Sequence, residues 1–392
     1  MTTNSAHVEQ PADAVFEVIV IGAGQAGLAI GRALQQRGRT FLIVDAGGEV
    51  GHVWRSRWDS LTLFTAARYS GLPGLPFPGD PDSYPTKDAA AQYLRSYAST
   101  FGLPIRHNTR VRRVTRDGAG FTVHTDGDTF RAARVVVATG PFQNPVVPAI
   151  AEGIGAHIPQ VHSSAYRNPE QLPDGPVLVV GAGNSGAQIA TELRRSRPVA
   201  LSGGSATRAL PQRVLGRDLF WWLTTTGLIS APGQSRLGRR FRSGGELVIG
   251  TSSRQLARAG VTMHPRVTAA DTTTVTFADG STTTPAAIVW ATGYRSDYKF
   301  IDVTGAVDAA GAPIHQRGVS PVPGLYFLGL PWQHTRGSAL LGFVGSDAAH
   351  IAAHITAHIT AAMARMPLVG MTACASVYWM PVMRVDCAVA RL

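Results

Sequence analysis

The sequence predicts an α/β protein with two Rossmann-like dinucleotide-binding domains of the three-layer ββα type, the second inserted in the first. Two observations support this prediction. A glycine-rich motif follows an apolar strand at Gly22 and again at Gly181, and each unit later ends in Ala-Thr-Gly, at residues 138–140 and 291–293. Such an internal repeat indicates two copies of one supersecondary unit. Two copies in one chain imply two nucleotides, one that stays bound and one that binds and dissociates.

The first motif is the centre of the first unit. Residues 18–21 are apolar without polar alternation, as in a parallel strand buried on both faces. In the motif that follows, Gly22 permits the tight turn, Gly24 lets a pyrophosphate approach the backbone, and Gly27 lets the next helix pack against the strand. A helix is expected from Ala26 to Arg37, and its free N–H groups would hold negative charge.

An acidic residue follows at the spacing that a ribose requires. A second apolar strand, from Thr40 to Val44, ends at Asp45, 23 residues after Gly22. A carboxylate near this position accepts hydrogen bonds from the ribose of a bound dinucleotide. A lone glycine motif is weak evidence, but the succession of strand, motif, helix, strand and acid is specific. The alternative is a glycine-rich turn without a ligand.

The remaining elements of the first unit are predicted from periodicity and turn residues. The stretch 47–77 is rich in Gly, Pro and aromatic residues, which indicates an ordered loop over a ligand or, alternatively, a hydrophobic clamp without one. Residues 88–101 keep helical spacing. Strands are expected at 111–114, 120–124 and 129–137.

The second unit repeats this order of elements. Its motif is Gly181-x-Gly183-x-x-Gly186, and a short strand and a long helix close the fold near the end of the chain. The elements that we expect are a helix over 184–195, a strand over 199–202, strands near 267 and 275, a strand over 325–328 and a helix from 345 to about 366.

The segment after the strand at 199–202 predicts which nucleotide binds. Residues 201–208 contain serines and Arg208 but no acidic residue. An acid here would bind the ribose of NADH and repel a 2′-phosphate, whereas a guanidinium binds phosphate bidentately. We therefore predict NADPH in preference to NADH.

Composition limits the class of protein. The net charge of +11 comes from arginine, since Lys87 and Lys299 are the only lysines, and no basic run is interleaved with aromatic residues. We therefore expect no nucleic-acid partner and attribute the charge to attraction of an anionic cofactor. The only cysteines, Cys374 and Cys387, form no Cys-x-x-Cys, which fits a reducing cytoplasm. No signal peptide and no membrane span are expected.

No metal site is expected either. His350, His354 and His358 recur every four residues on the last predicted helix, but without a partner motif they indicate a helix face.

The paired motifs resemble those of the class B flavin-dependent monooxygenases, which include flavin-containing, YUCCA-type and Baeyer–Villiger monooxygenases, and they are most similar to bacterial CzcO-like flavoproteins. The resemblance covers about residues 15–365. It rests on Gly51-x-x-Trp-Arg-x-Arg-Trp-Asp-Ser-Leu-x-Leu-Phe64, Leu72-Pro-Gly-Leu-Pro-Phe77, Tyr84-Pro-Thr-Lys87, His162-Ser-Ser-x-Tyr166, Leu210-Pro-Gln-Arg-Val-Leu-Gly-Arg-Asp218, Ala291-Thr-Gly-Tyr294 and Gly345-Ser-Asp347.

The resemblance implies that the first site holds FAD. The helix that starts near Asp347 would direct its N-terminus at the flavin ring and stabilise negative charge on the reduced form. The implied FAD-binding residues are Gly22, Gly24, Gln25, Ala26, Gly27, Asp45, Ala46, Trp54, Arg55, Thr65, Val111, Ala138, Thr139, Gly140 and Asp347.

The resemblance likewise assigns NADPH to the second site. The implied residues are Gly181, Gly183, Asn184, Ser185, Gly186, Ser202, Arg208, Ala291, Thr292 and Gly293. The domain boundaries that follow are a disordered N-terminus at 1–14, an FAD-binding domain at 15–145 and 296–366, an NADPH-binding domain at 146–295, and a tail of unknown role at 367–392.

By the same resemblance, NADPH reduces FAD, O2 adds to the reduced flavin as a C4a-peroxide, and one oxygen atom reaches a small organic substrate. The flavin carries the difficult chemistry, so no protein residue is certain to be catalytic. The candidates are Arg55, His162 and Tyr166. One departure is that Ala156 and Ile158 replace the Phe and Gly of the wider group's motif before His162, which weakens the case for Baeyer–Villiger or typical N- and S-oxidation.

Two other functions remain open at this point, and a third is disfavoured. A flavoprotein disulfide reductase needs a cysteine pair against the flavin, and the sequence lacks one. An NADPH oxidase or diaphorase would release oxygen as peroxide. A non-catalytic NADPH sensor would bind both nucleotides without reducing the flavin. The sequence also leaves open the substrate (an amine or sulfide, a 2-oxo acid such as an indolepyruvate, or a ketone) and whether the protein forms a homodimer.

Overall fold

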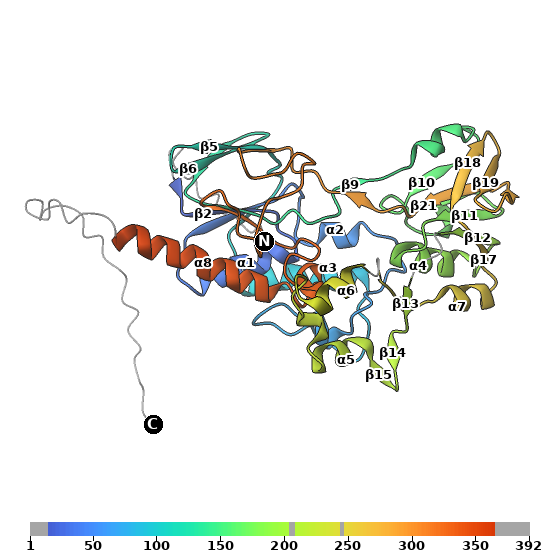
Figure 1. Cartoon of the computed structure of the whole chain (residues 1–392), viewed down its shortest axis with the longest axis horizontal. Coiled ribbons are helices and arrows are strands. Elements are labelled where there is room, and N and C mark those ends of the chain that lie inside the picture. Colours follow the sequence, from blue (N-terminus) through green and yellow to red (C-terminus); the bar gives the residue numbers. More distant parts are fainter. Residues whose placement is uncertain (1–14, 204–207, 244–246, 365–392) are drawn as a thin grey trace, which may run out of the picture.

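The computed structural model describes residues 15–203, 208–243 and 247–364. The described chain forms two lobes side by side (Figure 1). Each lobe contains a five-stranded parallel sheet, as expected for two Rossmann-like units. The stretches 1–14 and 367–392, for which we predicted disorder and an unknown role, lie outside the described residues.

The parallel sheet of the first lobe carries the first glycine motif. Its strand order is β24–β8–β2–β3–β4. The bounds are β2 (Val18–Ile21), β3 (Phe41–Val44), β4 (Ile105–Arg106), β8 (Val135–Val137) and β24 (Leu325–Phe327). All four residues of β2 are buried, because both faces of the sheet are covered. β24 comes from the chain after the second lobe, so segments on either side of that lobe share one sheet.

A second sheet covers one face of the first. Its order is β1–β7–β6–β5–β23, with bounds β1 (Val15–Phe16), β5 (Val111–Asp117), β6 (Gly120–Thr125), β7 (Thr129–Ala132) and β23 (Ile301–Asp302). Its apolar side chains pack against Ile19, Ile21, Val135 and Val137 of the parallel sheet.

The prediction of one strand over 129–137 is wrong. The chain leaves the outer sheet at the end of β7 and enters the parallel sheet as β8, so two strands replace the one expected. The physical reason is a change of environment: β7 alternates exposed and buried residues, whereas β8 is buried throughout.

Helices cover the other face of the parallel sheet, which completes three layers. They are α1 (Gln25–Gln35), α3 (Lys87–Thr100) and α8 (Gly345–Ala364), joined by the short helices α2 (His52–Arg55), η1 (Ala67–Tyr69) and η5 (Arg336–Ala339). α1 and α8 lie next to each other (Figure 1). α3 starts one residue before the predicted position because the Thr86 side chain caps it.

The second lobe repeats the parallel sheet with the order β10–β21–β11–β12–β17. Its elements are β10 (Gln160–His162), β11 (Val177–Val180), α4 (Asn184–Leu193), β12 (Val199–Ser202), α7 (Ser253–Arg258), β17 (Thr262–His264), β18 (Val267–Asp271), β19 (Thr274–Phe277), β20 (Thr282–Thr283) and β21 (Ala287–Trp290). The short helices η2 (Ala149–Gly153) and η3 (Pro169–Gln171) complete it.

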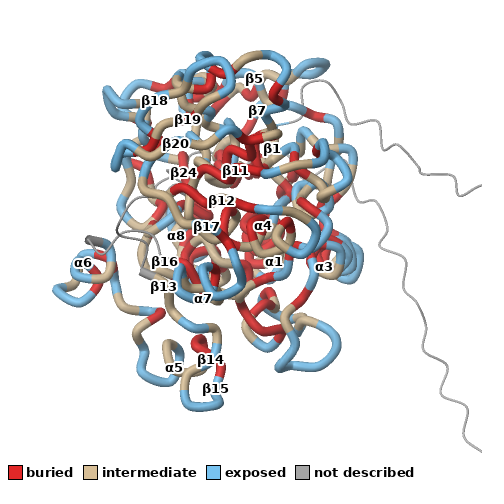
Figure 2. Tube along the Cα trace, turned by 90° about the vertical axis from the view of Figure 1, so that its right-hand side faces the viewer, coloured by how far each residue is buried: buried red, intermediate tan, exposed pale blue. Residues whose placement is uncertain are grey.

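Two further groups of elements join and flank the lobes. The connecting segments pair with each other as β9 (Asn144–Pro145) and β22 (Tyr294–Arg295). A small subdomain over residues 208–249 contains β13 (Arg208–Leu210), β14 (Arg213–Val214), β15 (Arg217–Asp218), α5 (Leu219–Thr225), η4 (Leu228–Ser230), α6 (Arg236–Ser243) and β16 (Leu247–Ile249). Buried residues gather in the two sheets and their helices, while α6 lies at the left edge and the β14–β15 hairpin at the bottom (Figure 2).

Candidate functional site

The first glycine loop has the geometry of a pyrophosphate site. Gly22 has a φ of 106°, and a Cβ atom there would lie 2.6 Å from the carbonyl oxygen of Ala138. A Cβ atom on Gly27 would overlap the carbonyl oxygen of Gly22. At Gly24, by contrast, a Cβ atom would meet no protein atom within 4 Å. The fold therefore requires glycine at 22 and 27, whereas the open space beside residue 24 fits a ligand.

The start of α1 faces the same loop. Gly24 is the N-cap of α1 and offers no side-chain acceptor to the N–H groups of the first turn. Unsatisfied N–H groups and the positive end of the helix dipole favour an anion at this place. The Gln25 side chain is held away by a hydrogen bond of 2.9 Å from Nε2 to the carbonyl oxygen of Ala339.

Asp45 lies beside the loop at the end of β3. Its Oδ2 accepts a hydrogen bond from the Ala23 N–H at 2.6 Å, and its Oδ1 accepts one from the Gly47 N–H at 2.7 Å. The carboxylate thereby links β3 to the glycine loop, and Ala46 follows Asp45 directly in the sequence. Each carboxylate oxygen retains a second lone pair, so the side chain can still accept from a ribose hydroxyl.

The N-terminus of α8 points a buried acid into the first lobe. Asp347 is 3% exposed and its Oδ1 accepts a hydrogen bond from Arg317 Nε at 3.2 Å. The acid lies in the first turn of α8, where the helix dipole stabilises negative charge. The structure therefore places the Asp347 carboxylate in a local ion pair at the N-terminus of α8.

The residues expected along a flavin ring divide into two groups. Trp54 on α2 is half-buried against the core, and Thr65 is buried with its Oγ1 at 2.8 Å from Ser70 Oγ. Arg55 turns outward, and its Nε pairs with Glu49 Oε1 at 3.1 Å on the surface. Glu49 also pairs with Arg95. Of the catalytic candidates, Arg55 thus belongs to an exposed ion-pair network.

The other first-site residues lie at the ends of strands. Ala138 is buried at the end of β8, and Gly140 takes a φ of 71° where the chain turns toward the second lobe. The Thr139 hydroxyl accepts a hydrogen bond of 2.9 Å from Gln143 Nε2. Val111 starts β5, half-buried, across the edge of the sheet.

The second glycine loop repeats the first. Gly181 has a φ of 109°, and a Cβ atom on it would overlap the carbonyl oxygen of Ala291. A Cβ atom on Gly186 would overlap the carbonyl oxygen of Gly181. Gly183 is the N-cap of α4, again without a side-chain acceptor, and Ser185 lies in the first turn of that helix. This loop therefore offers the same kind of anion site.

The side chains beside the second loop form hydrogen bonds with other parts of the protein. Asn184 Oδ1 accepts from the Ile249 N–H at 2.9 Å. The buried Ser202 hydroxyl donates to the carbonyl oxygen of Pro265 at 2.7 Å, and Thr292 Oγ1 donates to the carbonyl oxygen of Val146. The backbone of Arg208 starts β13, while its side chain lies outside the part of the chain that the structure describes.

His162 lies at the junction of the lobes, at the end of β10. Its Nε2 is 3.0 Å from the carbonyl oxygen of Gly293, and its Nδ1 is 3.1 Å from the Ser164 backbone nitrogen. Burial lowers the pKa of His162, and the charge of Arg57 lowers it further. The neutral ring therefore donates from Nε2 and accepts at Nδ1, which holds the second Ala-Thr-Gly turn in place.

Tyr166 packs inside the second lobe. Its side chain has no exposed surface, and its hydroxyl donates to Glu192 Oε2 on α4 at 2.8 Å. Burial raises its pKa, so the hydroxyl stays protonated. The Tyr166 hydroxyl is therefore directed at α4, and only the backbone of Tyr166 meets His162, where its N–H donates to the His162 carbonyl oxygen at 3.0 Å.

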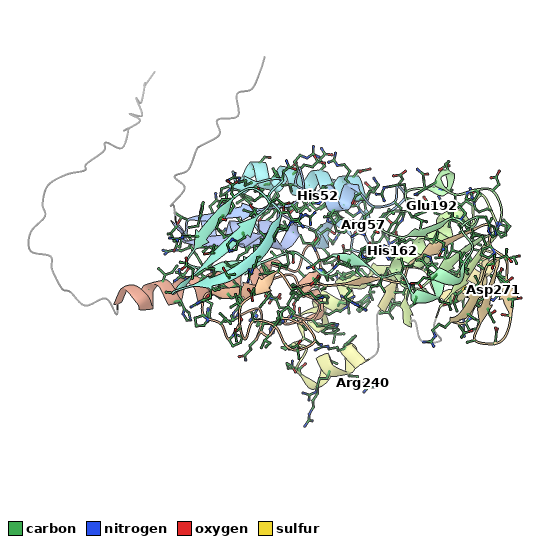
Figure 3. The ribbon with its side chains drawn as sticks, turned by 90° about the horizontal axis from the view of Figure 1, so that it is seen from above. His52, Arg57, His162, Glu192, Arg240 and Asp271 are labelled. Atoms are coloured by element: carbon green, nitrogen blue, oxygen red, sulfur yellow. The ribbon has the colours of Figure 1, made fainter. Side chains whose placement is uncertain are left out.

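Sequence reasoning missed a charged side chain between the two sites. Arg57 follows α2 in the first lobe, and its Nη1 donates to the hydroxyl of Tyr294, directly after the second Ala-Thr-Gly. Its guanidinium also lies over the rings of Tyr294 and Phe142, at 5.2 and 5.7 Å. Figure 3 shows Arg57 and His162 facing the same junction. The Tyr294 of the Ala-Thr-Gly-Tyr motif was the available signal, but its partner is 237 residues away.

The subdomain and the first lobe enclose an apolar cavity. Its lining comes from α5, η4, α6 and the segment that includes η5, and it consists of Leu210, Leu219, Phe220, Leu223, Leu228, Ile229, Ala231, Gly238, Phe241, Ile249, Trp332, Arg336 and Leu340. Phe220 also contacts Phe64, which precedes the expected flavin residue Thr65. The cavity thus lies near the expected flavin position.

Known proteins share both the sequence and the fold. The family profile described as pyridine nucleotide-disulphide oxidoreductase matches residues 19–203. An "Uncharacterized oxidoreductase CzcO-like" from Geobacillus kaustophilus is 46% identical over 338 residues, which span 86% of this chain and 97% of the relative. The chain belongs to the CzcO-like oxidoreductases.

More distant relatives agree with this placement of the CzcO-like chain. The indole-3-pyruvate monooxygenase YUCCA4 of Oryza sativa subsp. japonica is 28% identical and matches 72% of this chain and 75% of its own length. The solved structure of a flavin-containing monooxygenase from Stenotrophomonas maltophilia matches with a TM-score of 0.74 at 26% identity, covering 88% of this chain and 98% of that one. The resemblance to this group and the α/β fold class are thus confirmed.

Two absences apply to the described part of this CzcO-like oxidoreductase. Within residues 15–203, 208–243 and 247–364, no three His, Cys, Asp or Glu side chains gather as a metal site, and His354 and His358 simply stack along α8 with ring centroids 4.4 Å apart. In the same residues no helix has the length and apolar character to cross a bilayer.

Proposed function

We propose that this CzcO-like oxidoreductase is an FAD- and NADPH-dependent monooxygenase that transfers one oxygen atom from O2 to a small organic substrate. The observation that carries the proposal is the pair of glycine loops, each directly before a helix N-terminus without a side-chain cap. At the first loop the open space beside Gly24 fits a pyrophosphate, so the residues present are compatible with a dinucleotide.

FAD is assigned to the first lobe, which on this proposal spans residues 15–145 and 296–366. Gly22, Gly24 and Gly27 would hold its pyrophosphate together with the N–H groups of Gln25 and Ala26. Asp45 and Ala46 would meet the ribose, and Val111 the adenine. Trp54, Thr65, Ala138, Thr139, Gly140 and the α8 N-terminus at Asp347 would surround the flavin.

NADPH is assigned to the second lobe, residues 146–295. Gly181, Gly183, Asn184, Ser185 and Gly186 would hold its pyrophosphate. Ser202 and Arg208 would face the 2′-phosphate, since no acidic residue follows β12. The turn Ala291-Thr292-Gly293, held by His162, would close the site.

When bound, the flavin accepts hydride from NADPH and activates O2. The residues of the chain would bind the two nucleotides, orient them toward each other and exclude water from the site. The donor at His162 Nε2 fixes Gly293, and the guanidinium of Arg57 places a positive charge between the two sites. The positive end of α8 would stabilise negative charge on the reduced ring. An apolar substrate fits the cavity between α5, η4, α6 and η5.

The experiment measures where the electrons of NADPH go. The purified protein is reduced with NADPH without oxygen, and ¹⁸O₂ is then admitted with a panel of apolar sulfides, amines, 2-oxo acids and ketones. We expect the flavin to bleach with NADPH, and one substrate to lower the peroxide released per NADPH and to carry one ¹⁸O atom.

Two results would contradict the proposal. Peroxide equal to the NADPH consumed, with every substrate, would make the protein an oxidase. A flavin that dithionite bleaches but NADPH does not would make it a non-catalytic binding protein. Equal efficiency with NADH would contradict the role given to Arg208. The reducing cytoplasm expected from the cysteine count is the proposed location.

A further inference from the structure

The small subdomain carries an unusual share of the positive charge. Residues 208–249 contain seven arginines (208, 213, 217, 236, 239, 240 and 242) and two acids, Asp218 and Glu246, so they contribute +5 of the net +11. Asp218 is buried, and its Oδ1 and Oδ2 accept from the Phe220 N–H and the Tyr84 hydroxyl. The surface of this subdomain is therefore almost purely cationic.

A hairpin in the subdomain exposes an apolar tip. Leu215 connects β14 and β15, is 86% exposed and has a φ of 50°. This left-handed backbone favours Gly or Asn, and a leucine here gains nothing from packing. The Trp222 indole donates to the carbonyl oxygen of Val214 at 3.0 Å, so the hairpin is held on α5. The fold gives no reason for an exposed leucine at this position.

Charge and aromatic side chains surround that tip. Arg213 and Arg217 flank Leu215 and are both exposed. The guanidinium of Arg217 lies 5.0 Å from the ring centroid of Trp221, which is half-buried. A tryptophan and an arginine beside an apolar residue are typical of segments that sit at a bilayer interface.

The nearby helix α6 has the same character. Arg236, Arg239 and Arg242 are exposed, and none of them forms an ion pair with an acid of the described residues. Leu237 on the same helix is 44% exposed, while Phe241 lines the apolar cavity. Figure 2 shows α6 at the left edge of the molecule and the hairpin at its bottom, and Figure 3 shows Arg240 on α6 at the outer edge of the ribbon.

A second arginine-rich surface, on β5 and β7, differs because its arginines form ion pairs. Arg112 pairs with Asp126, Arg113 with Asp302, and Arg131 with Asp117. The chain therefore pairs these sheet arginines with its own acids, whereas Arg236, Arg239 and Arg242 have no acidic partner among the described residues.

We propose that the subdomain docks this protein reversibly on the surface of an anionic phospholipid bilayer, with Leu215 inserted among the headgroups and the arginines of α6 on the lipid phosphates. A nucleic acid or an acidic protein would contact the arginines, but neither would gain from an exposed leucine beside a tryptophan. A bilayer uses both, since anionic headgroups attract arginine and the interface accepts leucine and tryptophan. The same subdomain lines the apolar cavity, so docking would bring the cavity close to molecules dissolved in the membrane.

The test is sedimentation of the full chain with vesicles of phosphatidylcholine containing 30 mol% phosphatidylglycerol, against pure phosphatidylcholine. Binding is expected with the anionic vesicles, and it should weaken as salt is raised. The triple variant Arg236→Gln/Arg239→Gln/Arg242→Gln should bind about a hundredfold more weakly, corresponding to about 3 kcal/mol. Leu215→Ser should weaken binding about tenfold.

Matched controls separate docking from general charge. Arg112→Gln/Arg113→Gln/Arg131→Gln removes the same formal charge from the paired surface and should change vesicle binding less than threefold. Ile314→Ser removes an apolar side chain that is 39% exposed in the first lobe and should have no effect.

Three results would overturn the proposal. They are no sedimentation with anionic vesicles, equal weakening by both arginine triples, and binding that does not depend on Leu215. Tighter binding to a 20-nucleotide RNA than to vesicles, unchanged by Leu215→Ser, would assign the surface to nucleic acid instead. The melting temperature of every variant is measured, and only variants that melt at the same temperature as the parent protein are compared, so that loss of fold is recognised.

Discussion

Glycines of the first loop serve two purposes that residue-scale geometry distinguishes. At positions 22 and 27 a side chain would strike the backbone of the protein, whereas at 24 it would enter open space. The φ of −76° at Gly24 is also accessible to alanine. Position 24 therefore permits a test of ligand binding that leaves the fold intact.

Gly24→Ala is expected to fold normally and to lose most of its FAD, because the new methyl group occupies the place of the pyrophosphate. The measurement is the ratio of flavin absorbance to protein after purification, together with the melting temperature. Gly127→Ala is the matched control, since a Cβ atom there also meets nothing within 4 Å. A fully yellow Gly24→Ala protein would contradict the assignment of the first site.

Tyr166→Phe tests whether the hydroxyl of this candidate acts in catalysis or in packing. Loss of the hydrogen bond to Glu192 is expected to lower the free energy of unfolding by about 1–2 kcal/mol. The rate of flavin reduction by NADPH should stay within about twofold of the parent protein, because the residue has no exposed surface. Denaturant unfolding and stopped-flow reduction are the two measurements, and a large fall in reduction rate at unchanged stability would restore the catalytic reading.

At the scale of elements, each nucleotide unit depends on a helix that packs closely against a strand. α4 approaches β11 only because residue 186 lacks a Cβ atom, and α1 approaches β2 through Gly27 in the same way. The two units are built separately, on different sheets. A change in one unit should therefore spare the other.

Gly186→Ala is expected to raise the apparent NADPH dissociation constant at least tenfold while FAD stays bound. The alanine methyl group would overlap the carbonyl oxygen of Gly181 and push α4 away from the second loop. Flavin content, reduction by dithionite and reduction by NADPH are measured together. Loss of FAD along with NADPH affinity would show that the units are not independent.

At the scale of the whole molecule, several partly buried histidines act in the same direction on stability. Burial lowers the pKa of each of them below the ordinary value of 6.5, and they are His162, His315, His334, His350 and His354. The unfolded chain therefore binds more protons than the folded chain just below pH 6.5. Stability is full above that pH and is lost as the pH falls through the lowered pKa values.

The melting temperature is accordingly expected to fall by several degrees between pH 7.5 and pH 5. Differential scanning calorimetry at constant ionic strength measures this change. His350→Gln removes one titrating ring from α8 and should make the fall smaller. A melting temperature that rises on acidification would show that the histidines gain partners in the folded state.

The sequence by itself determined the nucleotide units, because their signals are local. A strand, three glycines, a helix and a second strand follow one another within about thirty residues, and the backbone geometry of Gly22 and Gly181 follows from that order. Apart from the single strand expected over 129–137, the predicted elements of both units, and the helix that starts at Gly345, agree with their predicted positions to within a few residues.

Only the tertiary structure decided which distant segments meet. The break between β7 and β8 depends on which sheet each strand joins, and residues 129–137 contain no turn signal that separates them. Arg57 reaches Tyr294 across 237 residues, and Tyr166 turns into the second lobe because Glu192 on α4 lies there. Local sequence fixes backbone conformation, whereas burial and pairing between far segments depend on the packing of the whole chain. That is why the loops could be predicted, and the junction between them could not.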